Sequence, residues 1–120
     1  MDVEWTDQQR INEFSKLNTR FTALEAKLSK LKENKEDLDD LTMDIELVDD
    51  DEMLLYHIGD IFAHMQKVDI VARVEKDSEV LGEQISDVES KKADISERMA
   101  ELKDALYAKF GRENINLERD

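Results

Sequence analysis

The sequence has no cysteine and no proline, only three glycines, and few aromatic residues. The absence of cysteine excludes a disulfide scaffold and thiolate chemistry, and it fits a reducing compartment. Without proline, helices can run uninterrupted, since one interior proline costs about 3 kcal/mol. No apolar run approaches the roughly 20 residues that cross a bilayer, and the first residues are unlike a signal peptide. We therefore expect a cytoplasmic protein without a membrane partner.

The high charge of the chain limits both the partners and the fold that we expect. Charged residues make up 40% of the chain and the net charge is -14. Nucleic acids and anionic lipids need a cationic surface, so neither is expected as a partner. Regularly spaced Leu, Ile and Val argue against disorder, while the charge content argues against a compact globule with a large core. Long helices with a narrow apolar stripe satisfy both observations.

Two heptad patterns define the fold that we expect. The first spans a helix at about residues 7–48, with a capping box predicted from Thr6 to Gln9. Its three-four spacing runs through Phe14, Leu17, Phe21, Leu24, Leu28, Leu31, Lys35, Leu38, Thr42 and Ile45. The second spans about 69–110 and runs through Val71, Val74, Ser78, Leu81, Ile85, Val88, Lys92, Ile95, Met99, Leu102 and Leu106. A 3.5-residue period sustained this long predicts a coiled coil.

Arms of equal length that are joined by a short connector fold back most simply as an antiparallel pair. Mirror pairing about the connector places Ile45 near Val74, Leu24 near Ile95, and Phe14 near Leu106. Gly111 is suited to cap the second helix in a left-handed conformation, and residues 111–120 are expected to form an extended tail. The fold class is therefore mainly α, in one domain over residues 1–120.

The connector, at about residues 53–66, predicts a β-hairpin rather than a loop. Two short apolar strands flank Gly59 and Asp60, and glycine at the first turn position suits a type II′ turn. The register pairs six residues on one apolar face: Leu54 with Met65, Tyr56 with Ala63, and Ile58 with Ile61. Because an isolated hairpin is marginal and has two open edges, we expect this face to be a subunit interface. The alternative is a local core against the chain's own helices.

Particular stretches of this pattern resemble β-class subunits of prefoldin. They are INEFSKLN at 11–18, IEL at 45–47 with the aspartates after it, YHIGDIF at 56–62, LKDALYAKFG at 102–111, and INLE at 115–118. The resemblance implies a heterohexamer of two α-class and four β-class subunits, whose hairpins join into a β-barrel platform that carries six coiled coils. It also implies an ATP-independent co-chaperone that captures unfolded actin and tubulin at the coiled-coil tips. The cytosolic chaperonin would then receive them.

Four aromatic residues converge at the chain ends if the arms fold back: Trp5, Phe14, Tyr107 and Phe110. They are candidates for contact with an unfolded client, which needs apolar surface but no fixed geometry. The alternative is structural, with Phe14 closing the heptad stripe and Trp5 packing before the helix cap.

No catalytic, metal or cofactor site is expected. His57 and His64 lack the further ligands that zinc needs, and no nucleophile triad or glycine-rich phosphate loop is present, so the protein is not expected to be an enzyme. Residues 36–52 contain ten acidic residues and no basic one, without the glycine and glutamate spacing of a calcium loop. They predict a solvated surface, or a docking surface for a basic partner. A structural tether that never binds unfolded chains is the alternative function.

Overall fold

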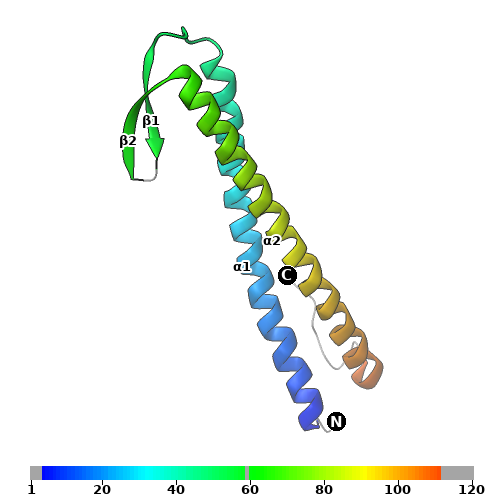
Figure 1. Ribbon diagram of the computed structural model, residues 1–120. Helices are drawn as coiled ribbons and strands as arrows, with labels where there is room; N and C mark the ends of the chain where they lie inside the picture. The colour runs from blue at the N-terminus through cyan, green and yellow to red at the C-terminus, as the bar shows by residue number, and fades with distance from the viewer. Residues whose placement is uncertain (1–3, 59, 112–120) are drawn as a thin grey trace. The chain divides into compact units, whose positions relative to one another are not determined.

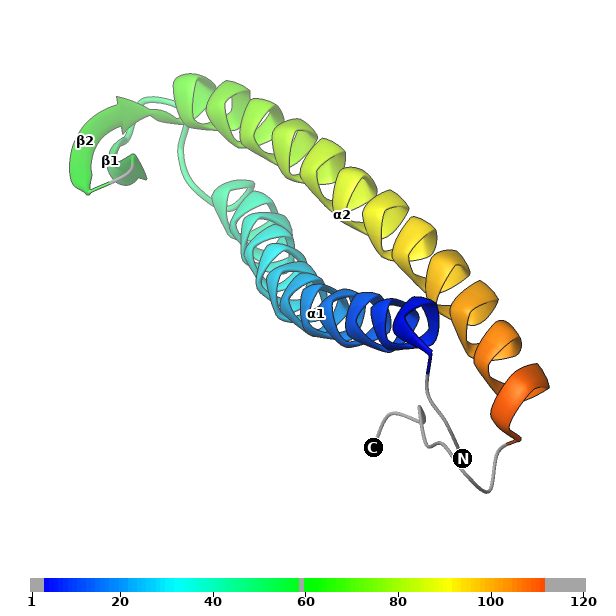
Figure 2. The same ribbon diagram turned by 90° about the horizontal axis from the view of Figure 1, so that it is seen from below.

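The computed structural model describes residues 4–58 and 60–111, although not the side chain of Ile58. The element order is α1 (Trp5–Ile45), β1 (Met53–Ile58), β2 (Ile61–Gln66) and α2 (Lys67–Phe110), as labelled in Figure 1. Both helices are continuous ribbons in Figure 2. The chain divides into two compact units, one with residues 1–27 and 88–120 and the other with residues 28–87. We call them the terminal unit and the hairpin unit.

The helix bounds differ from the expected ones by a few residues at three of the four ends. The helix α1 begins at Trp5 because the backbone N–H of Glu4 donates to Asp7 Oδ2 at 3.3 Å, which satisfies a donor that the helix leaves open. The predicted cap at Thr6 was therefore wrong. The helix α2 ends at Phe110 as expected, with Gly111 at φ 79° and its N–H donating to the Tyr107 carbonyl at 2.8 Å. This is the left-handed cap that the sequence predicted.

The terminal unit has a core made of heptad residues from both helices. Phe14, Met99 and Leu102 are buried together, and three further heptad residues pack against them: Leu17, Phe21 and Ile95. Phe14 thus packs with residues one to two turns earlier in α2 than the expected Leu106, which is itself fully buried. The Lys92 ammonium lies 5.0 Å from the centre of the Phe21 ring, so this polar heptad position is used by a cation–π contact.

The hairpin unit has its own core. Ile45 and Val74 pack together with Ile70 and Tyr56, which confirms the predicted pairing of Ile45 with Val74. Leu41 packs against this cluster, whereas the predicted Thr42 is exposed and donates its hydroxyl to the Leu38 carbonyl at 2.9 Å. A threonine hydroxyl can bond its own helix, so the apolar neighbour turns inward instead.

The polar heptad positions of the hairpin unit bond each other. Lys35 and Ser78 interrupt the apolar patterns of the two helices, and Lys35 Nζ donates to Ser78 Oγ at 2.9 Å. A half-buried ammonium keeps a partner in this way, and its carbon chain still covers apolar surface.

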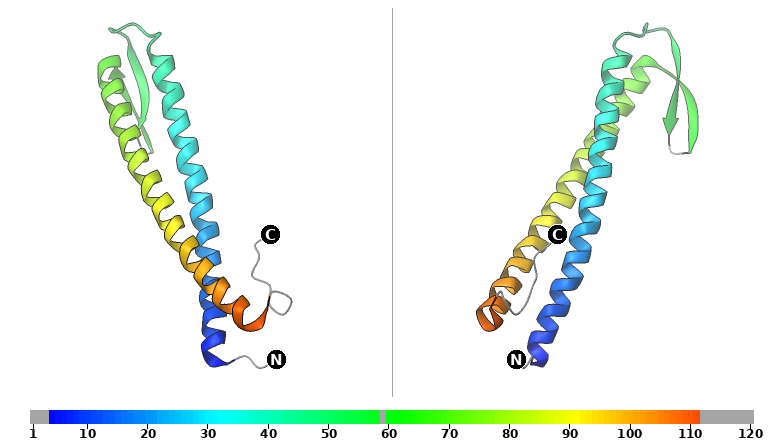
Figure 3. Two further views of the ribbon diagram at one scale, coloured as in Figure 1. Left: turned by 90° about the vertical axis from the view of Figure 1, so that its right-hand side faces the viewer. Right: turned by 180° about the vertical axis from the view of Figure 1, so that it is seen from behind.

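The strands pair as the sequence predicts. They form an antiparallel two-stranded sheet with Leu54 opposite Met65, Tyr56 opposite Ala63, and Ile58 opposite Ile61. Viewed from two sides in Figure 3, the strand pair turns back along helical residues of its own unit. The predicted type II′ turn depends on Gly59, and the predicted extended tail on residues 112–120, all of which lie outside the described residues.

Candidate functional site

The two faces of the hairpin have different environments. Leu54, Tyr56 and Met65 belong to the core of the hairpin unit, packed with Ile45 and Ile70. For these three residues of the expected interface, the local core that was the alternative is the arrangement present in the structure. Of the other three, Ala63 is half-buried, Ile61 is 65% exposed, and the side chain of Ile58 lies outside the described part.

Tyr56 fixes the inner face by a hydrogen bond. Its hydroxyl donates to Asp77 Oδ2 at 3.2 Å, and Arg73 Nε donates to the same carboxylate at 3.3 Å. Burial, and then the negative charge of Asp77, raise the pKa of the Tyr56 phenol above its usual range. The phenol therefore stays a donor, and the hairpin is tied to α2 both by apolar packing and by a specific bond.

The exposed outer face of the hairpin carries several large apolar side chains. Met53, Leu55 and Phe62 are all more than half exposed. His57 stacks on Phe62 with ring centres 4.6 Å apart, so a flat aromatic surface lies between the strands. Neither strand contains a Lys, Arg, Asp or Glu. With no other strand paired to it in the described residues, the hairpin presents an apolar face and two open edges, which together define a surface suited to further strands.

The aromatic residues of the terminal unit are not equivalent. Phe14 and Phe110 are buried at 7% and 6% exposure, and Tyr107 is half-buried beneath the Lys103 ammonium, 5.8 Å from the ring centre. Trp5 is 75% exposed. Heptad spacing accounts for the burial of Phe14. Phe110 is buried because the last turn of α2 packs against the start of α1, as the contacts of its neighbour Lys109 show.

An ion-pair cluster joins the first turn of α1 to the last turn of α2. Lys109 Nζ is bonded to Asp7 Oδ2 and lies 3.4 Å from Glu4 Oε2, while Arg10 lies 3.5 Å from the other oxygen of Asp7. The Lys109 bond holds the pKa of Asp7 below its usual range, and in return Asp7 raises the pKa of Lys109. The sequence does not predict this cluster, because charged residues at helix ends are usually solvated.

A second ion pair crosses between the helices, six residues further along α1 and eleven residues earlier in α2. Arg98 donates to both oxygens of Glu13, at 2.7 and 3.0 Å, and also to Glu101 at 3.2 Å. The bidentate Arg98 contact lowers the pKa of Glu13. This pair favours the observed register of the terminal unit, since a fork of two parallel bonds tolerates little sliding, although both side chains are partly exposed.

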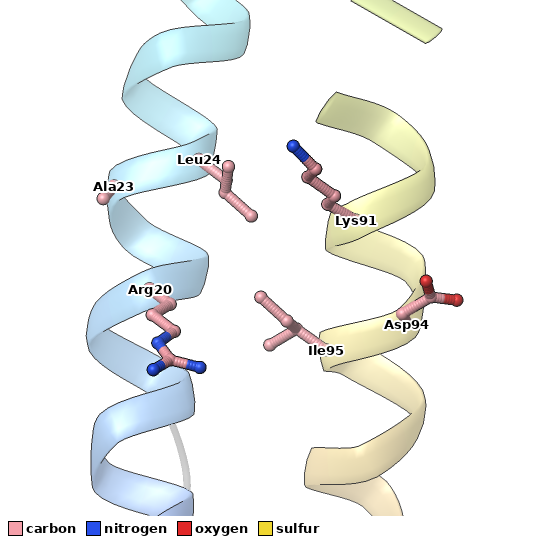
Figure 4. A pocket seen from close by; sticks show the side chains of 6 residues that line it. All are labelled: Arg20, Ala23, Leu24, Lys91, Asp94 and Ile95. Carbon is pink, nitrogen blue, oxygen red and sulfur yellow. The ribbon is translucent and has the colours of Figure 1, made fainter. Parts of the chain in front are cut away.

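An apolar groove lies between α1 and α2 in the terminal unit. Its volume is about 430 Å³, and Figure 4 shows Leu24 and Ile95 pointing toward each other across it. The pairing of Leu24 with Ile95 is therefore as the sequence predicts. Ala23 lines the same groove, and the charged residues along it are Arg20, Lys91 and Asp94.

The acidic segment at 36–52 surrounds the end of α1, which has no basic residue in its last turn. Lys67, the first residue of α2, fills that role. It donates to the carbonyls of Glu46 and Val48, at 3.4 and 3.0 Å, and lies 3.5 Å from Asp50. The cation offsets the negative end of the helix dipole, as a basic residue in the last turn would.

In residues 4–58 and 60–111, no three His, Cys, Asp or Glu side chains converge as metal ligands do. None of the helices described there is long and apolar enough to span a membrane.

A helix–hairpin–helix chain with an apolar hairpin face defines a class of coiled-coil subunit. A family model described as prefoldin subunit matches residues 8–113. Prefoldin subunit 4 of Saccharomyces cerevisiae is 50% identical over 98% of this chain and 90% of its own length. Prefoldin subunit 4 of Homo sapiens is 38% identical over all of this chain and 90% of its own length. The chain therefore belongs to the prefoldin family.

The fold agrees with that assignment. The crystal structure of the prefoldin beta subunit from Thermococcus strain KS-1 superposes with a TM-score of 0.78 at 15% identity, covering 89% of this chain and 94% of the other. The expected fold, two helices joined by a β-hairpin as in β-class prefoldin subunits, is confirmed. Family membership also establishes that the chain is a chaperone subunit of a prefoldin complex, which assembles with other prefoldin subunits.

Proposed function

We propose that this chain is one of four β-class subunits, which join two α-class subunits in a heterohexamer. The hexamer would capture unfolded actin and tubulin in the cytoplasm without ATP and pass them to the cytosolic chaperonin. The observation that carries the proposal is the family match over nearly the whole chain, together with an apolar hairpin face that the described part of the chain leaves uncovered. An interface elsewhere would leave that face in water.

Strand addition is the mode of assembly that the hairpin supports. Both edges of the two-stranded sheet are open in the described residues, so neighbouring hairpins can pair by backbone hydrogen bonds. Met53, Leu55 and Phe62 would then be covered by other chains. Ile61 and Ile58 remain our proposed interface residues at the turn end of the inner face. Leu54, Tyr56, Ala63 and Met65 would support the hairpin from behind.

Client capture is assigned to the terminal unit. Trp5 is its most exposed aromatic side chain among the described residues. Burial of Phe14 and Phe110 makes them supports for that end rather than contacts, and Tyr107 offers only one side of its ring. Weak apolar contacts suffice, because linked binding sites gain avidity of about 10²- to 10⁴-fold when several subunits act together.

The test has two arms. In the first, the chain is purified alone and with its partner subunits, and native mass spectrometry measures the assembly; a defined hexamer is expected only with the partners. In the second, actin is diluted from denaturant with or without the hexamer. We expect suppressed aggregation without ATP, and release of folded actin once chaperonin and ATP are added. An assembled hexamer that leaves aggregation unchanged would favour the structural tether.

A further inference from the structure

The groove of the terminal unit offers apolar surface where the buried aromatic residues do not. We propose that Ala23, Leu24 and Ile95 receive an apolar side chain of an unfolded client, and that Arg20 and Lys91 favour client segments in which carboxylates flank that side chain. This inference rests on the proposed function and adds to it the chemical class of segment that this subunit selects.

The groove has the size and lining of a side-chain site. Its volume of about 430 Å³ falls within the roughly 300–1,000 Å³ of ligand pockets, and the surface exposed inside it is almost wholly apolar although three of its six lining residues are charged. Leu24 and Ile95 extend toward each other from α1 and α2 (Figure 4), so they form the floor. Ala23 also lines the groove and contributes only a methyl group. A large aliphatic or aromatic side chain bound in the groove would remove both itself and the floor from water.

The charged residues beside the groove favour an occupant with acidic residues. The protein has a net charge of -14, yet only one of the three charged residues that line the groove, Asp94, is acidic. Arg20 and Lys91 line the groove itself. The carboxylate of Asp94 is directed away from α1 in Figure 4, so its repulsion of an anionic occupant is weak. A segment that combines an apolar centre with Asp or Glu on each side therefore complements both parts of the site.

The experiment compares two fluorescent peptides that have the same aliphatic and phenylalanine centre, one flanked by aspartates and the other by lysines. Their affinity for the reconstituted hexamer is measured by anisotropy. We expect the aspartate peptide to bind more tightly, by roughly 1.5- to 5-fold for each rim cation. The double substitution Arg20→Glu and Lys91→Glu should reverse the preference. The substitution Ala23→Phe should fill the groove and weaken both peptides on the order of ten-fold.

Two controls keep the result specific. Ala93→Phe adds the same ring to an exposed alanine of α2 that does not line the groove, and Lys16→Glu with Lys27→Glu makes the same charge change outside it. Both control hexamers should bind like wild type. Equal loss in the controls, or no preference for the aspartate peptide, would overturn the inference.

The proposed function is tested separately with the same proteins. If the wild-type hexamer fails to suppress actin aggregation, the proposed function fails. If it suppresses aggregation and Ala23→Phe leaves both peptide affinities unchanged, only the groove is excluded.

Discussion

Asp7 shows how a single residue links the two ends of the terminal unit. It is the one charged side chain that is buried among the described residues, at 1% exposure, and it lies against Lys109 and Arg10. A buried carboxylate without a cation would be costly, so these partners are needed for its burial. The pair therefore makes a contribution to stability that depends on pH.

Lys109→Met should lower the melting temperature of the hexamer at neutral pH, because Asp7 loses its main partner. The pKa of Asp7 is lowered in the folded chain, so its contribution is present above about pH 3.9 and disappears as pH falls through the lowered pKa. The pKa of Lys109 is raised, so its contribution is present below about pH 10.4 and disappears as pH rises through the raised pKa.

Calorimetry across pH measures the difference between wild type and variant. The difference in melting temperature should be largest between about pH 3.9 and about pH 10.4, and it should vanish as pH moves beyond the shifted pKa values on either side. Lys32→Met removes the same charge from an exposed position and serves as the control. A difference that does not change with pH would mean that Lys109 stabilises the fold by packing alone.

The two terminal aromatic residues should respond in opposite ways to replacement by serine. Trp5→Ser should leave the melting temperature nearly unchanged, since Trp5 is 75% exposed, and should reduce suppression of actin aggregation only in part. Phe110→Ser should destabilise the terminal unit by about 3 kcal/mol, in the range of large-to-small core substitutions. Thermal unfolding and aggregation assays separate the two effects. Complete loss of suppression in Trp5→Ser would instead indicate one specific pocket.

At the scale of elements, the end of α2 depends on a residue that tolerates positive φ. Gly111 has φ 79° and closes the helix by its bond to Tyr107. Gly111→Ala should destabilise the helix end by about 1 kcal/mol, because a Cβ disfavours the left-handed region. Gly82 lies inside α2 with nothing near the position of a Cβ, so Gly82→Ala should stabilise by about 0.5–1 kcal/mol. Urea unfolding of both variants measures the two changes in the free energy of unfolding. Changes of the same sign would contradict the different roles of the two glycines.

The two faces of the hairpin serve different purposes. Its inner face is fixed to the hairpin unit by Tyr56 and its neighbours, while its outer face and edges stay open. An element that is already packed on one side needs less ordering when it pairs with further strands. This division explains why a two-stranded sheet can exist before assembly.

At the scale of the whole molecule, the exposed hairpin residues should control assembly rather than folding of the helices. Phe62→Asp or Ile61→Asp places a charge where other chains are expected to cover the hairpin, at a cost of several kcal/mol. We expect loss of the hexamer in native mass spectrometry, with helical content by circular dichroism largely kept. Val80→Asp, at an exposed position within α2, should assemble normally. Hexamers that form with Phe62→Asp would show that the outer face is not the interface.

Much of this protein is determined locally by its sequence. Period and alternation of apolar residues predict both helices, the strand register and the pairing of Ile45 with Val74, because these patterns repeat over many residues. Gly111 predicts the end of α2, since few other residues adopt that conformation. The tertiary structure alone decided that the apolar face of the hairpin packs against the chain's own helices, because the sequence does not show that Ile70 and Asp77 lie beside Tyr56. It also decided that Phe110 is buried and that Asp7 binds Lys109, because residues about a hundred positions apart meet only when the chain has folded back.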